Sequence, residues 1–386
     1  MKAKNVLVVI NLFSSAENFV GGQFKYLSEK GYNMHLICSP DERIEKFAKE
    51  QGIRYKEIPL NRQLTIAQDI RSLRDICKYI RKHKIDTIIG HQVKGRLLAT
   101  TAAKLMKVPN TIIFAHGAIF ETAKGLKRKL LLAESKYESL LSDKVVCVSS
   151  YVQDLRNHNN IDKPGKQLIL GAGTCGGIDT INRFNKDLLD TEEIAELKSH
   201  YTIHENDFVI GFVGRLVKDK GIIELVEAFE ELKKRNPGKS LKLMIVGPIE
   251  KRDGLPQKVL DFIQNSKDII FTGKIPLNEM PKQYCCMDIL ILPSHREGFG
   301  FCNIEAQAMG VPVLTSHITG CRDSIKNTET GLYIDLNPSD IASKIESLFD
   351  NNIRQKMGKQ GRIWVHNNFD HTQVWPHVKN LLDSFE

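Results

Sequence analysis

The chain has 386 residues, of which 41% are hydrophobic and 26% are charged. This length and apolar content suit two globular domains, each with its own core. No apolar run approaches the roughly 18 residues that a membrane-spanning helix needs, so the sequence predicts none. The eight cysteines show no CxxC pair and no metal-like spacing. They are typical of reduced thiols, and we therefore expect a cytoplasmic location and no metal site.

The first half of the chain alternates short apolar runs with helical patterns. The run at residues 6–10 is too short for a signal peptide and predicts the first strand. Further strands are expected at residues 34–38, 86–90, 111–115, 145–149 and 167–170. Helical periodicity follows at residues 19–27 and 70–84.

A basic cluster opens a helical pattern near the middle of this half. Its cations are Lys124, Lys127, Arg128 and Lys129, and the apolar side of the same helix carries Leu126, Leu130, Ala133, Tyr137 and Leu140. Cations at a helix N-terminus oppose the macrodipole, so an anionic partner would explain them. A membrane surface or a diphosphate-linked acceptor fits, although an ordinary solvated face is also open. No basic–aromatic interleaving points to nucleic acid, which we do not expect as a partner.

Charge is divided unevenly along the chain. Residues 1–178 carry 29 Lys and Arg residues against 16 Asp and Glu residues, whereas the remainder carries 26 against 30. The first part is therefore basic and the second slightly acidic. This favours the first part as the one that meets an anionic surface.

The second half again alternates strands and helices. Strands are expected at residues 208–213, 241–246, 269–272, 289–293, 312–315 and 332–335, and a helix at residues 340–349. After the first of these strands, Gly214 ends the apolar run, and Arg215 and Lys220 precede a helical pattern. Two cations five residues apart on a strand-to-helix loop can clamp a diphosphate. A plain basic surface loop is the alternative.

The most informative stretch follows the strand at 289–293. Gly298, Phe299 and Gly300 lead into a helical pattern, and Glu297 and Glu305 lie eight positions apart. Eight positions are about two helical turns, so we expect both carboxylates on one side of a helix. A glycine-rich helix N-terminus offers free amides to a phosphate. Carboxylates for sugar hydroxyls beside such amides indicate a nucleotide-sugar pocket, unless the glycines only make a turn and the glutamates are solvated.

The alternating pattern predicts an α/β fold with two doubly wound parallel sheets. We place the first domain at residues 1–178 and the second at residues 179–371, with a last helix at 372–386 returning to the first. Ligands of such sheets bind at the carboxyl ends of the strands.

The two loop motifs, about 80 residues apart and in this order, resemble glycosyltransferase family 4. Similar runs occur at residues 116–117, 148–149, 171–184, 246–248, 271–274, 287–289, 319–325 and 330–332. The family has the GT-B fold, in which two Rossmann-like domains face an interdomain cleft. The chain looks like bacterial members that build capsular, exopolysaccharide or lipid-linked oligosaccharide chains.

The resemblance implies a retaining glycosyltransferase that uses a nucleotide sugar, expected to be a UDP-linked hexose or N-acetylhexosamine. The expected acceptor is a glycan, polyprenyl-diphosphate-linked, so the enzyme would lie on the inner face of the plasma membrane. No cofactor and no metal are expected, because side-chain cations would stabilise the leaving diphosphate.

The resemblance also assigns residue roles. Arg215 and Lys220 would hold the diphosphate, Glu297 and His116 the transferred sugar, and Glu305 the ribose hydroxyls. The other donor-binding positions would be Gly214, Gly247, Lys274, Gly298, Phe299 and Gly300. On the acceptor side we place His91 and Lys94, together with the basic cluster at 124–129. A purely structural histidine is the alternative for His116.

Two other functions remain open on this fold: a nucleotide-sugar epimerase and a catalytically silent partner subunit. The presence of Arg215, Lys220, Glu297 and Glu305 argues against both. One departure from the family concerns the phosphate loop that many relatives have directly after the first strand. Here Gly21 and Gly22 come later, inside a helical pattern, and we expect a loop at residues 11–18 in its place.

Overall fold

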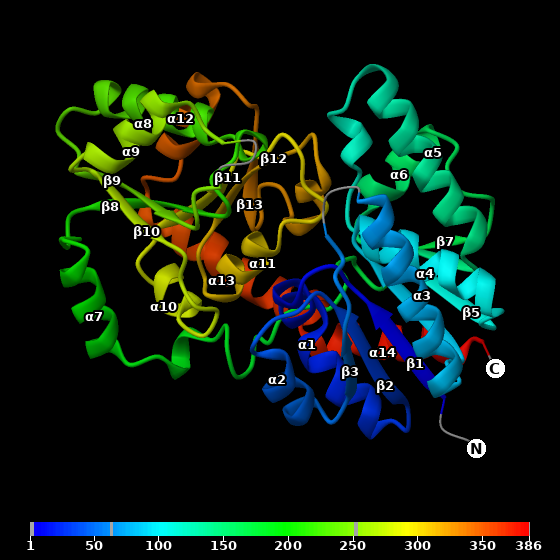
Figure 1. Cartoon of the computed structure of the whole chain (residues 1–386). Coiled ribbons are helices and arrows are strands. Elements are labelled where there is room, and N and C mark those ends of the chain that lie inside the picture. The colour runs from blue at the N-terminus through cyan, green and yellow to red at the C-terminus, as the bar shows by residue number, and fades with distance from the viewer. Residues whose placement is uncertain (1–3, 62–64, 251–253, 386) are drawn as a thin grey trace. The chain divides into compact units, whose positions relative to one another are not determined.

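The computed structural model describes residues 4–61, 65–250 and 254–385. The chain forms two compact units (Figure 1). Unit 1 comprises Met1–Gly177 and His371–Glu386, and unit 2 comprises Ile178–Asp370. Each unit is an α/β structure built on one parallel sheet.

The sheet of unit 1 has the strand order β3-β2-β1-β4-β5-β6-β7 within the described residues. The strands are β1 (Asn5–Val9), β2 (Asn33–Cys38), β3 (Arg54–Glu57), β4 (Thr87–His91), β5 (Asn110–Ala115), β6 (Lys144–Cys147) and β7 (Gln167–Leu168). The helices are α1 (Phe13–Glu29), α2 (Ile44–Gln51), α3 (Ile66–His83), α4 (Val93–Met106), α5 (Gly125–Leu141), α6 (Ser150–His158) and α14 (His371–Asp383), with a 3-10 turn η1 (Ile119–Glu121). Strand order reverses between β1 and β4. These two strands pair with each other, and Val6 lies opposite Thr87. Such a switch point is where open α/β sheets bind ligands.

The sheet of unit 2 has the order β10-β9-β8-β11-β12-β13. Its strands are β8 (Phe208–Val213), β9 (Leu241–Val246), β10 (Ile269–Gly273), β11 (Ile289–Leu292), β12 (Val313–Ser316) and β13 (Gly331–Ile334). Its helices are α7 (Thr191–His200), α8 (Ile222–Arg235), α9 (Gln257–Asn265), α10 (Met280–Tyr284), α11 (Phe301–Ala308), α12 (Pro338–Glu346) and α13 (Asn351–Phe369). Short 3-10 turns are η2 (Lys186–Leu188), η3 (Lys218–Lys220) and η4 (Gly320–Ser324). The switch point here lies between β8 and β11.

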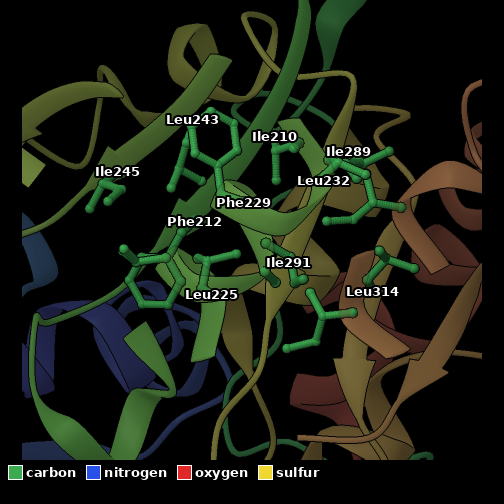
Figure 2. Close-up of a cluster of buried hydrophobic side chains, with 14 of the residues drawn as sticks. Ile210, Phe212, Leu225, Phe229, Leu232, Leu243, Ile245, Ile289, Ile291 and Leu314 are labelled. Carbon is green, nitrogen blue, oxygen red and sulfur yellow. The ribbon is translucent and has the colours of Figure 1, made fainter. Parts of the chain in front are cut away.

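The core of unit 2 packs α8 onto the central strands. Figure 2 shows Phe229 of α8 among the strand residues Ile210, Leu243 and Ile289. Phe229 is 1% exposed, and β8 is buried almost throughout because helices cover both faces of a parallel sheet. Full burial of each such side chain contributes about 1.5–3 kcal/mol. This packing fixes the ends of β8 and β11, from which the candidate site extends.

Each of the twelve predicted strands overlaps an observed one, so the predicted α/β fold class is confirmed. The prediction missed β3, whose sequence is Arg-Tyr-Lys-Glu. This short strand lies at the sheet edge and is largely exposed, so no apolar signal marks it. Its pairing with β2, where His35 meets Arg54, is long-range information that a local pattern lacks.

The predicted loop at residues 11–18 is wrong, because α1 begins at Phe13. Gly21 and Gly22 lie inside this helix. A Cβ on Gly22 would stand 2.7 Å from the Trp375 ring of α14. Gly22 therefore lets a helix approach closely, which is a packing role.

Among the residues that the structure describes, no helix is both long and apolar enough to cross a membrane.

Candidate active site

The loops after the strands of unit 2 lie against one another through glycines. A Cβ on Gly221 would stand 1.8 Å from the carbonyl oxygen of Pro293, and Gly221 has a φ of +69°. A Cβ on Gly247 would likewise stand 1.9 Å from the carbonyl oxygen of Gly214. Only glycine permits such backbone contact in these conformations. The predicted donor positions Gly214 and Gly247 thus join the carboxyl ends of β8 and β9.

Lys220 and Glu297, predicted from separate motifs, form an ion pair in which Nζ donates to Oε2. Their side chains are 16% and 23% exposed. Burial opposes the charge of the ammonium, but the Glu297 carboxylate outweighs it and raises the pKa of Lys220. The other carboxylate oxygen, Oε1, accepts from the Gly298 amide over 3.2 Å. The cation predicted to bind a diphosphate and the carboxylate predicted to bind a sugar therefore lie side by side.

Arg215, the second predicted cation, makes its own pair. Its Nη1 donates to Oε2 of Glu250 over 2.9 Å, and its side chain is 47% exposed. Glu250 follows β9 and was not predicted as a site residue. An exposed guanidinium can exchange this surface partner at little cost.

Asp219 ties the loop after β8 to the loop after β11. Its carbonyl oxygen accepts from the His295 amide at 2.9 Å and from the Ser294 hydroxyl at 3.0 Å. Its carboxylate accepts from Arg296 at 2.7 Å, and His295 Nε2 lies 2.7 Å from Glu224 of α8. Sequence reasoning missed these contacts. They hold the loop that carries Lys220 against the loop that carries Glu297.

The glycine loop before α11 has the predicted form of a helix N-terminus. Gly300 adopts a φ of +85°, and α11 starts at Phe301. Phe299 is 2% exposed and packs edge-on against Phe369, so its ring anchors the loop while its backbone lies at the helix end. A Cβ on Gly320 would stand 2.0 Å from the carbonyl oxygen of Gly298. The loop is thus fixed before a helix end that favours anions.

Glu297 precedes α11, and only Glu305 lies within it. The expectation that both carboxylates lie on one helix is therefore wrong, because the helix begins four residues after Glu297. Glu305 accepts a hydrogen bond of 2.6 Å at Oε2 from the Tyr284 hydroxyl. Burial raises the pKa of Glu305, and the Tyr284 bond and the Arg183 guanidinium act against this. Neither partner was predicted.

The predicted donor residue Lys274 follows β10 directly and is exposed. It lies on the same edge of the sheet as Gly247, because β9 and β10 are parallel neighbours. The structure records no ion pair for Lys274 among the described residues, so its ammonium faces solvent.

In unit 1, His91 is the last residue of β4, His116 follows the neighbouring strand β5, and the two rings are hydrogen-bonded to each other. His91 Nδ1 lies 2.9 Å from His116 Nε2. His116 stacks on Phe19 and His91 on Phe114. Burial, helped by the Arg96 guanidinium, lowers the pKa of His116 to about 3, and burial also lowers that of His91. Both rings are neutral at neutral pH. His91 is 1% exposed, whereas His116 is partly exposed, so the predicted acceptor-side residue His91 could reach a ligand only through His116.

Lys94, predicted as a candidate residue for the acceptor or the membrane, is not available to a membrane surface. It is 5% exposed and pairs with Asp69 of α3 at 2.5 Å. A buried, paired ammonium cannot approach a lipid surface, and Lys94 instead joins α4 to α3.

The basic cluster at 124–129 is exposed, and so is the apolar stripe beside it. Leu126, Leu130 and Leu140 are 73%, 63% and 61% exposed. The opposite face of α5 buries Glu138, which accepts from Arg96 at 2.8 Å. Helix α5 thus exposes one line of leucines to solvent, while Leu131 and Leu132 of the same helix pack against the cluster of Ala118, Phe120 and Ile161.

Comparison with known proteins shows which class this arrangement belongs to. The family model described as Glycosyl transferase 4-like matches residues 8–149, and Glycosyl transferases group 1 matches residues 193–364. The chain is 29% identical to the capsular polysaccharide biosynthesis glycosyltransferase CapM of Staphylococcus aureus, covering 100% of this chain and 98% of that protein. It is 26% identical to an Escherichia coli UDP-Gal:α-D-GlcNAc-diphosphoundecaprenol α-1,3-galactosyltransferase, over 96% and 94%.

Structural neighbours agree on the fold. A glycosyltransferase from Rickettsia africae superposes with a TM-score of 0.81 at 22% identity, covering 100% of this chain and 99% of the other. HepE of Anabaena, in complex with UDP and glucose, superposes with a TM-score of 0.81 at 15% sequence identity, covering 99% of this chain and 100% of the other. Two Rossmann-like units of this kind define the GT-B fold. The chain belongs to the GT-B glycosyltransferases of family 4, and it is an enzyme of that class.

Proposed function

We propose that the enzyme is a retaining transferase for a UDP-linked hexose or N-acetylhexosamine, and that its acceptor is a lipid-linked glycan in polysaccharide biosynthesis. The observation that carries this is the Lys220–Glu297 pair beside the Gly298 amide. In this pair, Lys220 would bind the diphosphate and Glu297 would bind the sugar, just before the N-terminus of α11. The E. coli relative, named for a UDP-galactose donor and a diphosphoundecaprenol acceptor, supports the substrate class.

In this proposal the diphosphate takes Lys220 Nζ and Arg215 as partners. Both cations stabilise the charge that develops as the sugar–phosphate bond breaks, so no metal is needed. Glu297, released from Lys220, accepts from sugar hydroxyls, and Glu305 accepts from the ribose hydroxyls. The amides of Gly298 to Gly300 and the α11 N-terminus add to the phosphate site.

Retention follows from attack on the face that the phosphate leaves. The leaving phosphate then accepts the proton of the acceptor hydroxyl while an oxocarbenium-like ion is short-lived. The two glutamates bind hydroxyls, so the two-carboxylate scheme of glycosidases does not apply. His116, neutral at working pH, accepts from or donates to a sugar hydroxyl, and His91 orients its ring.

The outward face of α5 is proposed to dock on the anionic cytoplasmic surface of the plasma membrane. Leucines that enter the interface and cations beside them form the pattern of interfacial helices. Docking there would bring unit 1 to a polyprenyl-diphosphate acceptor.

A product analysis tests the proposal. Nucleotide sugars are first screened for thermal stabilisation, since a ligand at about 100 times its dissociation constant adds about 2.7 kcal/mol. The best donor, with its sugar labelled, is then incubated with a polyprenyl-diphosphate glycan. We expect a labelled glycan whose new linkage has the anomeric configuration of the donor by NMR. An inverted linkage would exclude retention, an altered free nucleotide sugar would indicate an epimerase, and no turnover with any pair would favour a silent partner.

A further inference from the structure

Tyr284 is a fully buried tyrosine whose hydroxyl contacts Glu305, a residue proposed to bind the nucleotide-sugar donor. It ends α10, its side chain is 0% exposed, and its ring packs against Phe184 with centroids 6.3 Å apart. Its hydroxyl donates to Glu305 Oε2 over 2.6 Å. Buried hydroxyls need a partner, and this one has a carboxylate, which makes the bond a strong one.

This bond leaves Glu305 divided between a fixed oxygen and an available one. Oε2 is held by Tyr284, while Oε1 has no hydrogen-bond partner in the part of the chain that the structure describes. A carboxylate with one oxygen fixed has its plane fixed as well. A ligand hydroxyl then meets an acceptor whose direction is set before binding, which reduces the cost of ordering.

We propose that Tyr284 is a positioning residue for nucleotide binding: its hydroxyl fixes the Glu305 carboxylate so that Oε1 faces the ribose hydroxyls of the donor. This rests on the proposed function, in which Glu305 holds the ribose. Tyr284 itself touches no ligand, and it acts only through Glu305.

Among the residues that the structure describes, three titratable or charged groups interact with the Glu305 carboxylate. They are the Tyr284 hydroxyl, the Arg183 guanidinium and the Cys302 thiol one turn earlier on α11. Burial raises the pKa of Glu305, while Tyr284 and Arg183 act to lower it. Arg183 also donates to the carbonyl oxygen of Leu277, which follows β10, and so ties the loop after β10 to the same cluster. Removing the Tyr284 hydroxyl removes one of the interactions that lower the pKa of Glu305. The pKa therefore rises, and Glu305 takes up a proton at higher pH.

The test is the conservative variant Tyr284→Phe, measured with UDP and 2′,3′-dideoxy-UDP by titration calorimetry. Tyr201→Phe is the matched control, because Tyr201 donates to Gln283 of the same helix at 2.9 Å and not to Glu305. We expect Tyr284→Phe to bind UDP roughly three- to tenfold more weakly, the effect of one lost hydrogen bond. Dideoxy-UDP, which lacks the ribose hydroxyls, should bind the variant and the native protein alike. The acidic limb of UDP affinity should move to higher pH in the variant alone.

Three results would overturn the inference. Native UDP affinity in Tyr284→Phe, with affinity lost in Glu305→Ala, would remove the positioning role and leave the ribose role of Glu305 standing. Equal weakening of UDP and dideoxy-UDP would show a general packing effect instead. If Glu305→Ala keeps native affinity for UDP, the ribose role in the proposed function fails too.

Discussion

Lys220 and Glu297 neutralise each other, so the diphosphate proposed to bind Lys220 would have to compete with a carboxylate for the ammonium. In the proposed function, binding a donor would exchange one anion for another at Lys220 and would free Glu297 for the sugar. The pair would then couple the two halves of the donor at the level of single residues. Removing either partner should affect binding and transfer differently.

Loss of a diphosphate cation should slow transfer. We expect Lys220→Ala or Arg215→Ala to lower kcat by roughly 10²-fold, as for loss of other transition-state charge partners. Lys218→Ala is the control, since Lys218 is an exposed cation of the same turn. Steady-state kinetics measures the effect, and native turnover in either variant would exclude that cation from the reaction.

Variants of Glu305 and Glu297 should differ in their effects on UDP binding and on sugar transfer. Glu305→Ala is expected to weaken binding of free UDP, because it loses a ribose partner. Glu297→Gln should leave UDP affinity unchanged or tighter, because Lys220 loses its competing carboxylate, while transfer falls. Calorimetry and turnover measured together check this. Equal loss of UDP affinity in both variants would contradict the division of roles.

His35 should make stability fall in acid. It lies buried on β2, with Nδ1 2.9 Å from the Tyr79 hydroxyl. Burial, then His83 and Arg54, lower its pKa from 6.5 to about 4. The unfolded chain therefore binds the proton first, and stability present above about pH 6.5 is lost as pH falls towards 4.

Between about pH 7.5 and 5 this one ring should account for about 2 kcal/mol of the free energy of unfolding. Urea unfolding of His35→Phe should show a correspondingly smaller pH dependence. Tyr79→Phe loses the same hydrogen bond but keeps the titrating ring, so its pH dependence should stay near native. An unchanged slope in His35→Phe would disprove the assignment.

The positions of residues that depend on a local pattern could be predicted from sequence, and contacts that depend on distant partners could not. Arg215, Lys220 and Glu297 sit on strand-to-helix loops with glycine signals. Tyr284 looks like one more apolar helix residue, and only the fold brings it to Glu305. The burial of Lys94 was missed for the same reason, since its partner Asp69 comes from another helix.

At the scale of elements, α5 is the unusual helix. Its sequence predicts an apolar side at Leu126, Leu130 and Leu140, but periodicity alone does not say which face points inward. The buried Arg96–Glu138 pair settles that, because it anchors the polar face to α4. The apolar stripe is left outside.

The α5 surface should bind anionic liposomes. Each cation near such a surface contributes about 1 kcal/mol, within roughly one Debye length. Changing Lys124, Lys127, Arg128 and Lys129 to Ser should weaken binding and make the remainder less salt-sensitive. Leu126→Ser with Leu130→Ser should weaken it while the salt dependence persists.

The control variant removes equal charge elsewhere on unit 1, at the exposed positions Arg81, Lys82, Lys84 and Lys104. It should keep native liposome binding, measured by co-sedimentation. UDP affinity should hold in all three variants, because the proposed donor residues lie in unit 2. Absence of binding by the native protein, or equal loss in the control, would exclude a role for α5.

At the scale of the whole molecule, EDTA should leave activity intact. The sequence contains no Asp-x-Asp metal motif, and the proposed diphosphate partners are the side chains of Arg215 and Lys220. Turnover is measured with EDTA and then with added Mn²⁺ or Mg²⁺. Inactivation by EDTA that either cation restores would point to metal-assisted departure of the diphosphate.

The return of α14 to unit 1 sets an order of completion during synthesis. Trp375 of α14 donates to the carbonyl oxygen of Gly176 at 2.8 Å, and its ring fills the space above Gly22. Unit 2 is continuous in sequence, so all of it leaves the ribosome before α14 does. Domains usually fold in the order in which they are made. Here unit 1 is begun first and completed last. Until α14 is synthesised, the surface of α1 around Gly22 stays exposed, where chaperones can bind it.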